Sequence, residues 1–335
     1  MYRRAAVLGS GSFGTALAQT LSSNFEEVRL WGRDEAHARR INAEHRNDAY
    51  LKGIELSDRI RAVTSLPEAL GDAELVVVAI PSHATREVMG EAIPVLPRQV
   101  PIVTVAKGIE NDTLLTMTEV LESVLPAELH PYLAVLSGPS FARELAQKMP
   151  TVVTIASHWA RVGQTCQQML QTEAFRSYTS PDVVGVQLGG ALKNVIAIAA
   201  GMSDGLGFGH NARSALITRG LAEITRMAVR LGANPLTLSG LSGMGDLVLT
   251  CTGDLSRNRT VGFELGKGRK LGEILESMNQ VAEGVKTARS TRDLAARSGV
   301  EMPIAEQVYA ICYEDKDPRR AVVELMTRRP KAEQV

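Results

Sequence analysis

The stretch AAVLGSGSFGTALAQTL, residues 5–21, decides the fold of the N-terminal half. Its first four residues are apolar, as in a buried parallel strand, and helix formers follow the turn. Gly9, Gly11 and Gly14 between them match GxGxxG. After a strand and before a helix, such glycines permit a tight turn, let the backbone approach a pyrophosphate, and allow close helix–strand packing. The alternative is a glycine-rich turn without a ligand, but the context favours a dinucleotide site.

Strand-like and helix-like segments alternate from this stretch to about residue 180. The further strand candidates are EVRLWGRD (27–34), ELVVVAIPS (74–82), PIVTVAKG (101–108), LAVLSGPS (133–140) and TVVTIAS (151–157). Helical stretches at 34–45 and 111–125 lie between some of them. This alternation predicts a Rossmann-like α/β domain over residues 1–185, with a doubly wound parallel sheet.

From Asp182 onward the strand signals fade. Apolar residues recur at alternating spacings of four and three and so predict one apolar face of a helix: Ile217, Leu221, Ile224, Ala228 and Leu231. Gly232 and Pro235 then predict the end of this helix. Segments 284–300 and 304–314 also look helical, and Ser256 is placed to cap a helix. We expect an all-α second domain over residues 186–330, followed by a frayed tail.

Composition excludes several classes of function. The chain has 335 residues, with 37 Lys and Arg against 37 Asp and Glu, so nothing in the charge favours a nucleic-acid or anionic-membrane partner. The three cysteines are far apart, which fits a reducing cytoplasm. No apolar run suggests a membrane span, so we expect no membrane insertion. HExxH and P-loop motifs are absent from the sequence, no GxSxG stretch follows a predicted strand as a nucleophile elbow would, and we expect no metal site.

The residue after the second strand bears on the choice of cofactor. An acid there favours NAD, whereas an arginine accommodates the 2′-phosphate of NADP. The chain reads Trp31-Gly32-Arg33-Asp34. Because Arg33 comes first, we expect NADP(H) to be preferred. The adjacent Asp34 leaves NAD(H) as an alternative, and Arg33 as a solvated loop residue is another.

Ligands of open α/β sheets bind outside the carboxyl ends of the strands. Three polar clusters follow predicted strands, at residues 81–83, 106–108 and 137–142. Lys107 is thus a cation near the expected nicotinamide. Ser140 and the backbone around Gly138 are candidates to bind substrate oxygens.

Lys193 lies in the helix-like stretch GGALKNVIAIAAGMSDG, residues 189–205. The positions three and four residues away hold Gly, Ile and Ala, and no acid. Poor solvation would lower the pKa of this lysine and let it exchange a proton near neutral pH. The alternatives are that it reaches water or pairs with a distant acid. The adjacent Asn194 is either a packing amide or a donor to the substrate.

The segment GMGDLVLTCTGDLSRNR, residues 243–259, adds polar candidates. Ser256, Arg257 and Asn258 open a helix with a hydroxyl, a guanidinium, an amide and free N–H groups, which suits a phosphate. Alternatively, Ser256 is only a cap and Arg257 is solvated. Asp246 is either a turn residue or the acid that orients Lys193.

These motifs resemble one known family when they are taken in order. GSGSFGTALA, PSH, AKGIE, SGPSFARELA, GVQLGGALKNVIAIAAGMSDGLGFGHNARSALITRGLAE, GDLVLTCT and SRNR together strongly resemble bacterial-type NAD(P)-dependent glycerol-3-phosphate dehydrogenase, from about Ala5 to about Thr327. The block around Lys193 is the most specific part of the resemblance, and the glycine fingerprint is the least specific.

The resemblance implies a cytoplasmic enzyme that reversibly reduces dihydroxyacetone phosphate to sn-glycerol 3-phosphate for phospholipid synthesis. It implies a second domain like the C-terminal domain of 6-phosphogluconate dehydrogenase, and suggests a homodimer. Lys193 would be the proton donor and acceptor, held unpaired and poorly solvated. The cofactor contacts would be Ser12, Phe13, Arg33, Lys107, Ala142, Arg257, Val281 and Glu283. The substrate contacts would be Lys107, Gly138, Ser140, Lys193, Asp246, Ser256, Arg257 and Asn258.

Two rival interpretations use the same residues. A β-hydroxyacid dehydrogenase also places a lysine on an interdomain helix, but the Ser-Arg-Asn triplet at 256–258 argues against it. A non-catalytic dinucleotide sensor would have no use for Lys193, Asp246 and Arg257 together.

Overall fold

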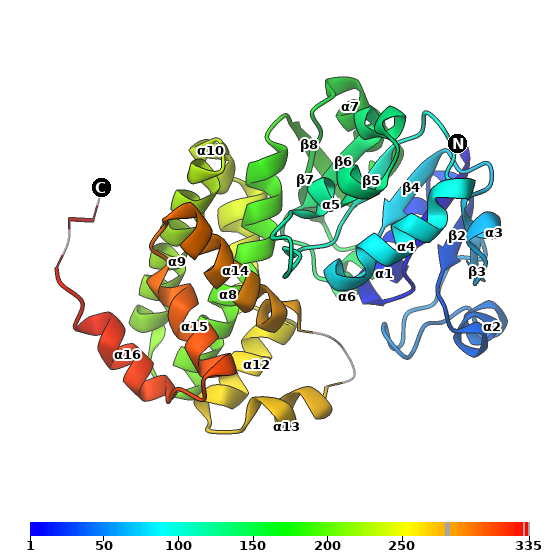
Figure 1. Cartoon of the computed structure of the whole chain (residues 1–335). Coiled ribbons are helices and arrows are strands. Elements are labelled where there is room, and N and C mark those ends of the chain that lie inside the picture. The colour runs from blue at the N-terminus through cyan, green and yellow to red at the C-terminus, as the bar shows by residue number, and fades with distance from the viewer. Residues whose placement is uncertain (279–281, 331, 334–335) are drawn as a thin grey trace.

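A computed structural model describes residues 1–278, 282–330 and 332–333. A sheet flanked by helices forms one part of the molecule, and a bundle of helices forms the other (Figure 1). The strands are β1 (Tyr2–Leu8), β2 (Phe25–Trp31), β3 (Ile60–Val63), β4 (Leu75–Val78), β5 (Ile102–Thr104), β6 (Leu133–Ser137), β7 (Thr151–Ala156) and β8 (Phe175–Ser180). The helices of this part are α1 (Ser12–Leu21), α2 (Glu35–Glu44), α3 (Leu66–Leu70), α4 (Thr85–Ala92), α5 (Met117–Val124), α6 (Ala142–Ala146) and α7 (Ala160–Leu170).

The strand order is β3-β2-β1-β4-β5-β6-β7-β8. The first six strands are parallel and follow the dinucleotide-binding order, which confirms the predicted Rossmann-like domain. The sheet departs from the parallel arrangement at one pair of strands, because β7 runs antiparallel to β6. The connection between these two strands contains only the five-residue helix α6, and an antiparallel neighbour needs no helical crossover. β3 and β8 also escaped prediction.

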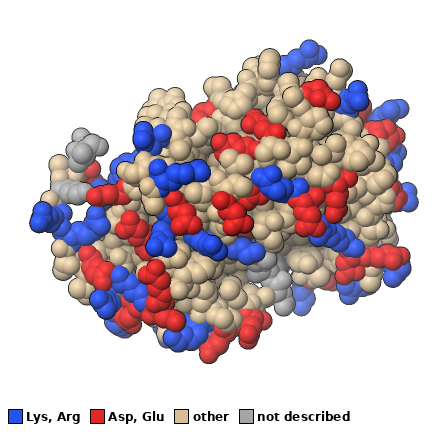
Figure 2. Space-filling view, in the orientation of Figure 1, with Lys and Arg blue, Asp and Glu red and all other residues tan. Residues whose placement is uncertain are grey.

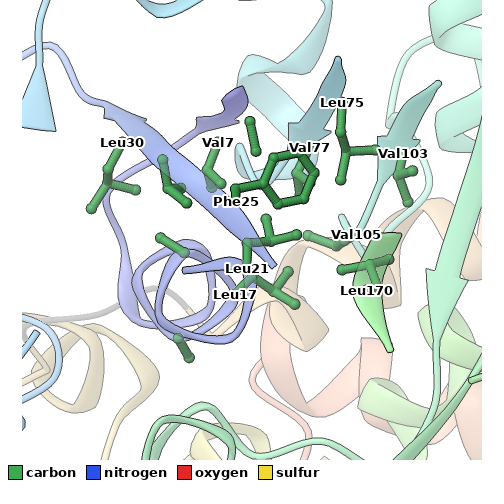
Figure 3. Packing of buried hydrophobic residues seen from close by; sticks show 14 of the residues in the cluster. Val7, Leu17, Leu21, Phe25, Leu30, Leu75, Val77, Val103, Val105 and Leu170 are labelled. Carbon is green, nitrogen blue, oxygen red and sulfur yellow. The ribbon is translucent and has the colours of Figure 1, made fainter. Parts of the chain in front are cut away.

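The sheet is buried on both faces because consecutive residues of its central strands are apolar and point to opposite faces. On β1, Ala5 and Val7 belong to the core under α1, α2, α6 and α7, whereas Ala6 and Leu8 belong to the core under α3, α4 and α5. Figure 3 shows Leu17 and Leu21 of α1 in the first of these cores, with strand residues around Phe25. Because the first six strands are parallel, their carboxyl ends meet at one edge of the sheet, which carries the candidate site.

The helix predicted over 111–125 begins later than expected, at Met117. Thr116 and Glu119 form a capping box, and Leu114 has a left-handed φ of 60°, so the preceding residues form a loop. Ser256 caps its helix as predicted. The helix with the apolar face ends at Arg230, close to the predicted stop at Gly232.

The second part of the molecule is helical, as predicted. Its helices are α8 (Val183–Gly205), α9 (His210–Arg230), α10 (Pro235–Leu238), the π-helical turn η4 (Leu241–Gly245), α11 (Asp246–Thr252), α12 (Arg257–Gly266), α13 (Leu271–Glu276), α14 (Glu283–Ser298), α15 (Pro303–Tyr313) and α16 (Pro318–Met326). The predicted domain boundary at residues 185–186 falls in the first turn of α8.

The helix α8 corrects one expectation from the sequence. In length and apolar character it passes as a membrane span, although we expected no such run. In the folded protein 89% of its most apolar window is buried, which is typical of a core helix. Charged side chains of both signs are interspersed over the face of the molecule in Figure 2.

Glycines bring α8 and α12 into backbone contact. A Cβ on Gly201 would lie 2.0 Å from the Arg259 carbonyl oxygen, and one on Gly205 would lie 2.2 Å from that of Phe263. In return, a Cβ on Gly262 would lie 2.0 Å from the Ile198 carbonyl oxygen. Real Cβ atoms do not approach that closely, so only glycine fits at these positions. The backbones of the two helices therefore pack directly against each other.

Candidate active site at the carboxyl edge of the sheet

The glycine turn after β1 has the shape that a pyrophosphate requires. Gly9 has φ of 119°, and a Cβ there would lie 2.4 Å from the Ala79 carbonyl oxygen. A Cβ on Gly14 would lie 1.9 Å from the Gly9 carbonyl oxygen. Gly11, by contrast, faces open space and precedes α1 without a side-chain cap. The N–H groups at the start of α1 thus remain available to an anion, and the turn fits a dinucleotide.

The predicted cofactor residues near this turn make defined contacts within the protein. Ser12 Oγ donates to the Tyr50 carbonyl oxygen at 2.8 Å, and Phe13 packs against the core. Arg33 Nη2 lies 2.7 Å from Glu87 Oε1, and both of these side chains are more than half exposed. The structure thus places Arg33 beyond β2, as expected, but pairs it with an acid that sequence reasoning missed.

The residue cluster at the centre of the site joins the two parts of the molecule. Lys107 follows β5, Lys193 lies on α8, and Asp246 begins α11. Asp246 Oδ1 is 2.5 Å from Lys193 Nζ, and Asp246 Oδ2 is 2.6 Å from Lys107 Nζ. The side chain of Asp246 is 1% exposed and that of Lys193 is 7% exposed. One buried carboxylate thus accepts from two ammonium groups.

The expectation that Lys193 is unpaired is wrong, whereas the expectation of poor solvation is correct. A buried ammonium without a partner would be very costly, and Asp246 supplies that partner from another helix. Lys193 Nζ also donates to Thr250 Oγ1 at 2.6 Å. Burial lowers the pKa of Lys193 to about 8; Asp246 opposes this shift and Lys107 adds to it.

The end of β6 supports Lys107. Lys107 Nζ donates to the Gly138 carbonyl oxygen at 3.1 Å, and Ser140 Oγ donates to the same oxygen at 2.9 Å. Gly138 has φ of 149°, and a Cβ there would lie 2.9 Å from Cα of Val153. The predicted oxygen-binding residues thus lie beside the lysine cluster.

The start of α12 connects to the lysine helix through amide groups. Asn258 Nδ2 donates to Asn194 Oδ1 at 3.0 Å, and Asn258 Oδ1 accepts from the Gly284 N–H at 2.9 Å. Ser256 Oγ accepts from the Arg259 N–H at 3.2 Å, so it caps α12. Asn194, which the sequence left open as a packing amide or a substrate donor, is buried beside Lys193.

The start of α14 contacts the sheet part of the molecule. Glu283 Oε1 accepts from the Ser82 N–H at 3.2 Å, just beyond β4. Burial raises the pKa of the Glu283 carboxyl, and the Ser82 N–H opposes that shift. Ala142 begins α6. The predicted cofactor residue Val281 lies outside the described residues.

Two residues that matter here were not among the predicted site residues. Thr250 Oγ1 accepts from Lys193 and donates to the Asp246 carbonyl oxygen at 2.6 Å. The spacing of four between Asp246 and Thr250 on one helix was a usable signal. Gln187 Oε1 accepts a hydrogen bond from the Thr118 N–H at 2.8 Å, which joins α8 to the start of α5. No local sequence pattern indicates that contact. Among the described residues, no group of three His, Cys, Asp or Glu is placed to hold a metal.

Similarity to known proteins extends over nearly the whole chain. The model of the NAD-dependent glycerol-3-phosphate dehydrogenase N-terminus matches residues 4–162, and that of the C-terminus matches residues 182–323. A Myxococcus xanthus protein named glycerol-3-phosphate dehydrogenase (NAD(P)+) is 71% identical over 330 residues, which are 98% of each chain. A Leptospira biflexa protein of the same name is 53% identical over 329 residues, which are 98% of this chain and 99% of that one.

Solved structures give the same result. A glycerol-3-phosphate dehydrogenase from Coxiella burnetii superposes with a TM-score of 0.92 at 38% identity, covering 98% of this chain and 99% of that one. A ketopantoate reductase from Ralstonia eutropha shares the fold alone, at a TM-score of 0.59 and 15% identity over 96% of this chain and 99% of that one. This chain belongs to the NAD-dependent glycerol-3-phosphate dehydrogenase family.

Proposed function

We propose that the protein reversibly reduces dihydroxyacetone phosphate to sn-glycerol 3-phosphate with a reduced nicotinamide cofactor. The observation that carries this proposal is the buried Lys107–Asp246–Lys193 cluster at the carboxyl edge of a dinucleotide-binding sheet. Membership of the family and the names of its relatives support the same reaction. The product is a precursor of glycerophospholipids.

The residues at the glycine turn fit a dinucleotide, which would supply the hydride for the carbonyl carbon. Gly9, Gly11 and Gly14 would admit its pyrophosphate to the N-terminus of α1. Ser12, Phe13, Arg33, Lys107, Ala142, Arg257 and Glu283 would line the rest of its site, together with Val281.

The substrate phosphate belongs at the start of α12. Ser256, Arg257 and Asn258 offer a guanidinium, an amide and the N-terminus of a ten-residue helix. Asn258 is already oriented by Asn194 and Gly284, so it enters the complex with little loss of freedom. Binding energy from this remote phosphate would orient the carbonyl against the lysine cluster.

Lys193 Nζ would deliver a proton to the substrate oxygen as hydride reaches the carbonyl carbon. A pKa of about 8 suits this role, because both protonation states are then populated near neutral pH. Asp246 keeps Nζ in place, and Lys107 would help to neutralise the developing alkoxide. Gly138 and Ser140 would complete the substrate contacts.

A preference for NADPH over NADH is the finer part of this proposal. Arg33 lies beyond β2, where a 2′-phosphate would be recognised. Its ion pair with Glu87 is exposed and therefore weak, so a phosphate would compete with it readily.

The decisive assay follows the loss of reduced-nicotinamide absorbance with dihydroxyacetone phosphate. NADPH and NADH are run in parallel, and dihydroxyacetone without the phosphate is the control. Consumption only with the phosphorylated substrate is the expected result. A folded protein that binds NADPH but consumes it with neither substrate would favour a dinucleotide sensor.

We also infer a cytoplasmic protein, since Cys166, Cys251 and Cys312 are all free thiols. The homodimer suggested by the family resemblance is tested by light scattering during gel filtration, where a monomer mass would exclude it.

A further inference from the structure

Two consecutive glycines on α8 precede Lys193 by four and three residues. A Cβ on Gly189 would lie 2.5 Å from the Ser242 carbonyl oxygen and 3.3 Å from Cα of Gly243. A Cβ on Gly190 would lie 2.5 Å from Ser137 Oγ and 3.6 Å from Cγ of Lys107. Two other segments of the chain thus touch α8 about one turn before the lysine.

Each of these contacts lies directly beside a member of the charged cluster. Ser242 belongs to the π-helical turn η4, which runs straight into Asp246. π-helical turns are rare and occur frequently at functional sites. Ser137 ends β6 and precedes Gly138, whose carbonyl oxygen accepts from Lys107. The separation between α8 and these two segments therefore determines how closely Asp246 and Lys107 approach Lys193.

We propose that Gly189 and Gly190 are positioning residues, which let η4 and the end of β6 approach α8 closely enough for Asp246 to bridge Lys193 and Lys107. This inference rests on the proposed function, because it concerns the acid–base group of that reaction. It explains why two glycines rather than two alanines lie about one helical turn before Lys193.

The two glycines differ in what opposes a side chain. At Gly189 the nearest atom is the backbone oxygen of Ser242, which moves only if η4 moves. At Gly190 the nearest atom is Ser137 Oγ, which is buried and has no hydrogen-bond partner in the described structure. The next atoms, Cβ of Ser137 at 3.5 Å and Cγ of Lys107 at 3.6 Å, are at ordinary contact distance. Removal of the Ser137 hydroxyl should therefore make room for an alanine at position 190.

The test uses Gly189→Ala, Gly190→Ala, Ser137→Ala and the double variant Ser137→Ala/Gly190→Ala. Gly90→Ala in α4 is the matched control, since its Cβ would meet only Val124 Cγ1 at 3.8 Å. The measurements are kcat across pH, the Kd of NADPH by fluorescence, and the melting temperature.

For Gly189→Ala we expect kcat to fall by about 100-fold with the NADPH Kd unchanged, because a displacement of about 1 Å has that effect on an oriented reaction. The midpoint of the kcat profile for reduction should also move to lower pH, since a more distant Asp246 stabilises the charged lysine less. Gly190→Ala should lose activity that the double variant regains, whereas Ser137→Ala and Gly90→Ala should match the wild type.

A folded Gly189→Ala variant with wild-type kcat and pH midpoint would overturn the proposal. So would a double variant that is no more active than Gly190→Ala, and this comparison remains decisive if Gly189→Ala does not fold. Titration of the Lys193 ¹³Cε resonance by NMR, assigned with Lys193→Met, needs no turnover. An unchanged titration in folded Gly189→Ala would refute the positioning role, whereas failure of the wild type to use dihydroxyacetone phosphate would refute the proposed function alone.

Discussion

Lys193 Nζ and Asp246 Oδ1 are 2.5 Å apart, and both side chains are buried. The two groups come from different helices and are 53 residues apart in the chain. Burial lowers the pKa of the lysine and the carboxylate raises it again, so the contact tunes the proton affinity of Nζ rather than merely tying two helices together.

The replacement Lys193→Ala should reduce kcat by at least 100-fold, because general acid–base catalysis typically contributes 10²–10⁴-fold. NADPH binding should stay nearly unchanged, and fluorescence titration measures it separately. Near-normal turnover, or loss of NADPH binding, would contradict the assigned role. Lys267→Ala is a control, since that residue lies at the end of α12 away from the cluster.

The two directions of the reaction should depend on pH in opposite senses. Reduction needs the protonated lysine, so kcat for dihydroxyacetone phosphate should fall as the pH rises through about 8. Oxidation of glycerol 3-phosphate needs the neutral lysine and should rise over the same range. Both profiles are measured at saturating substrate; profiles that move together would argue against a single titrating donor.

Asp246→Asn should lower the pKa of Lys193 further, because the largest opposing influence is lost while burial remains. The falling limb of reduction should then move to lower pH. Removal of one partner from a buried ion pair also costs about 3–5 kcal/mol in the free energy of unfolding. Denaturant unfolding measures that cost, and a variant as stable as the wild type would show that the pair is not buried in solution.

Arg33→Ala should raise the KM for NADPH by about 10-fold or more and leave that for NADH almost unchanged, because a charge-assisted hydrogen bond contributes about 1.5–3 kcal/mol. Glu87→Gln removes only the exposed partner, so it should leave stability unchanged and should not raise the KM for NADPH. Equal effects of Arg33→Ala on the two cofactors would remove Arg33 from the specificity site.

A second buried acid predicts how stability changes with pH. Glu223 on α9 accepts from the Ile304 N–H at 2.8 Å and the Ala305 N–H at 3.3 Å, and burial raises its pKa to about 7. The folded state therefore binds a proton that the unfolded state releases near pH 4.5, so this stabilising contribution is full below pH 4.5 and is lost as the pH rises through 7.

The free energy of unfolding should thus fall by about 3 kcal/mol from this group between pH 4.5 and 8, at 1.36 kcal/mol per pKa unit. Glu223→Gln should flatten that dependence in urea titrations. An equally steep dependence in the variant would assign the effect to other groups.

Local patterns were enough for much of this architecture, and the exceptions have physical causes. The glycines at 9, 11 and 14 and the continuous apolar runs predicted the dinucleotide domain, because a parallel sheet buries both of its faces. β8 was missed because FRSYTS buries only Phe175 and Ser177, so no apolar run marks it, and β3 was missed because it has only four residues.

The site was predicted as a set of residues but not as a geometry. Helix periodicity identifies neighbours within four residues, so Lys193 looked unpaired. Its partner Asp246 lies on another helix; the sequence offered it only as one of two alternatives, and tertiary packing decides between them. The ion pair between Arg33 and Glu87 is likewise a contact between elements far apart in the sequence.

The backbone contact between α8 and α12 has a consequence for substrate choice. α8 carries the proposed proton donor, and α12 begins at the residues proposed to grip the phosphate. Because backbone packs against backbone at Gly201, Gly205 and Gly262, the packing of these helices sets the distance between the phosphate site and the proton donor. A phosphorylated ketone one carbon longer would not fit this distance, however similar its chemistry.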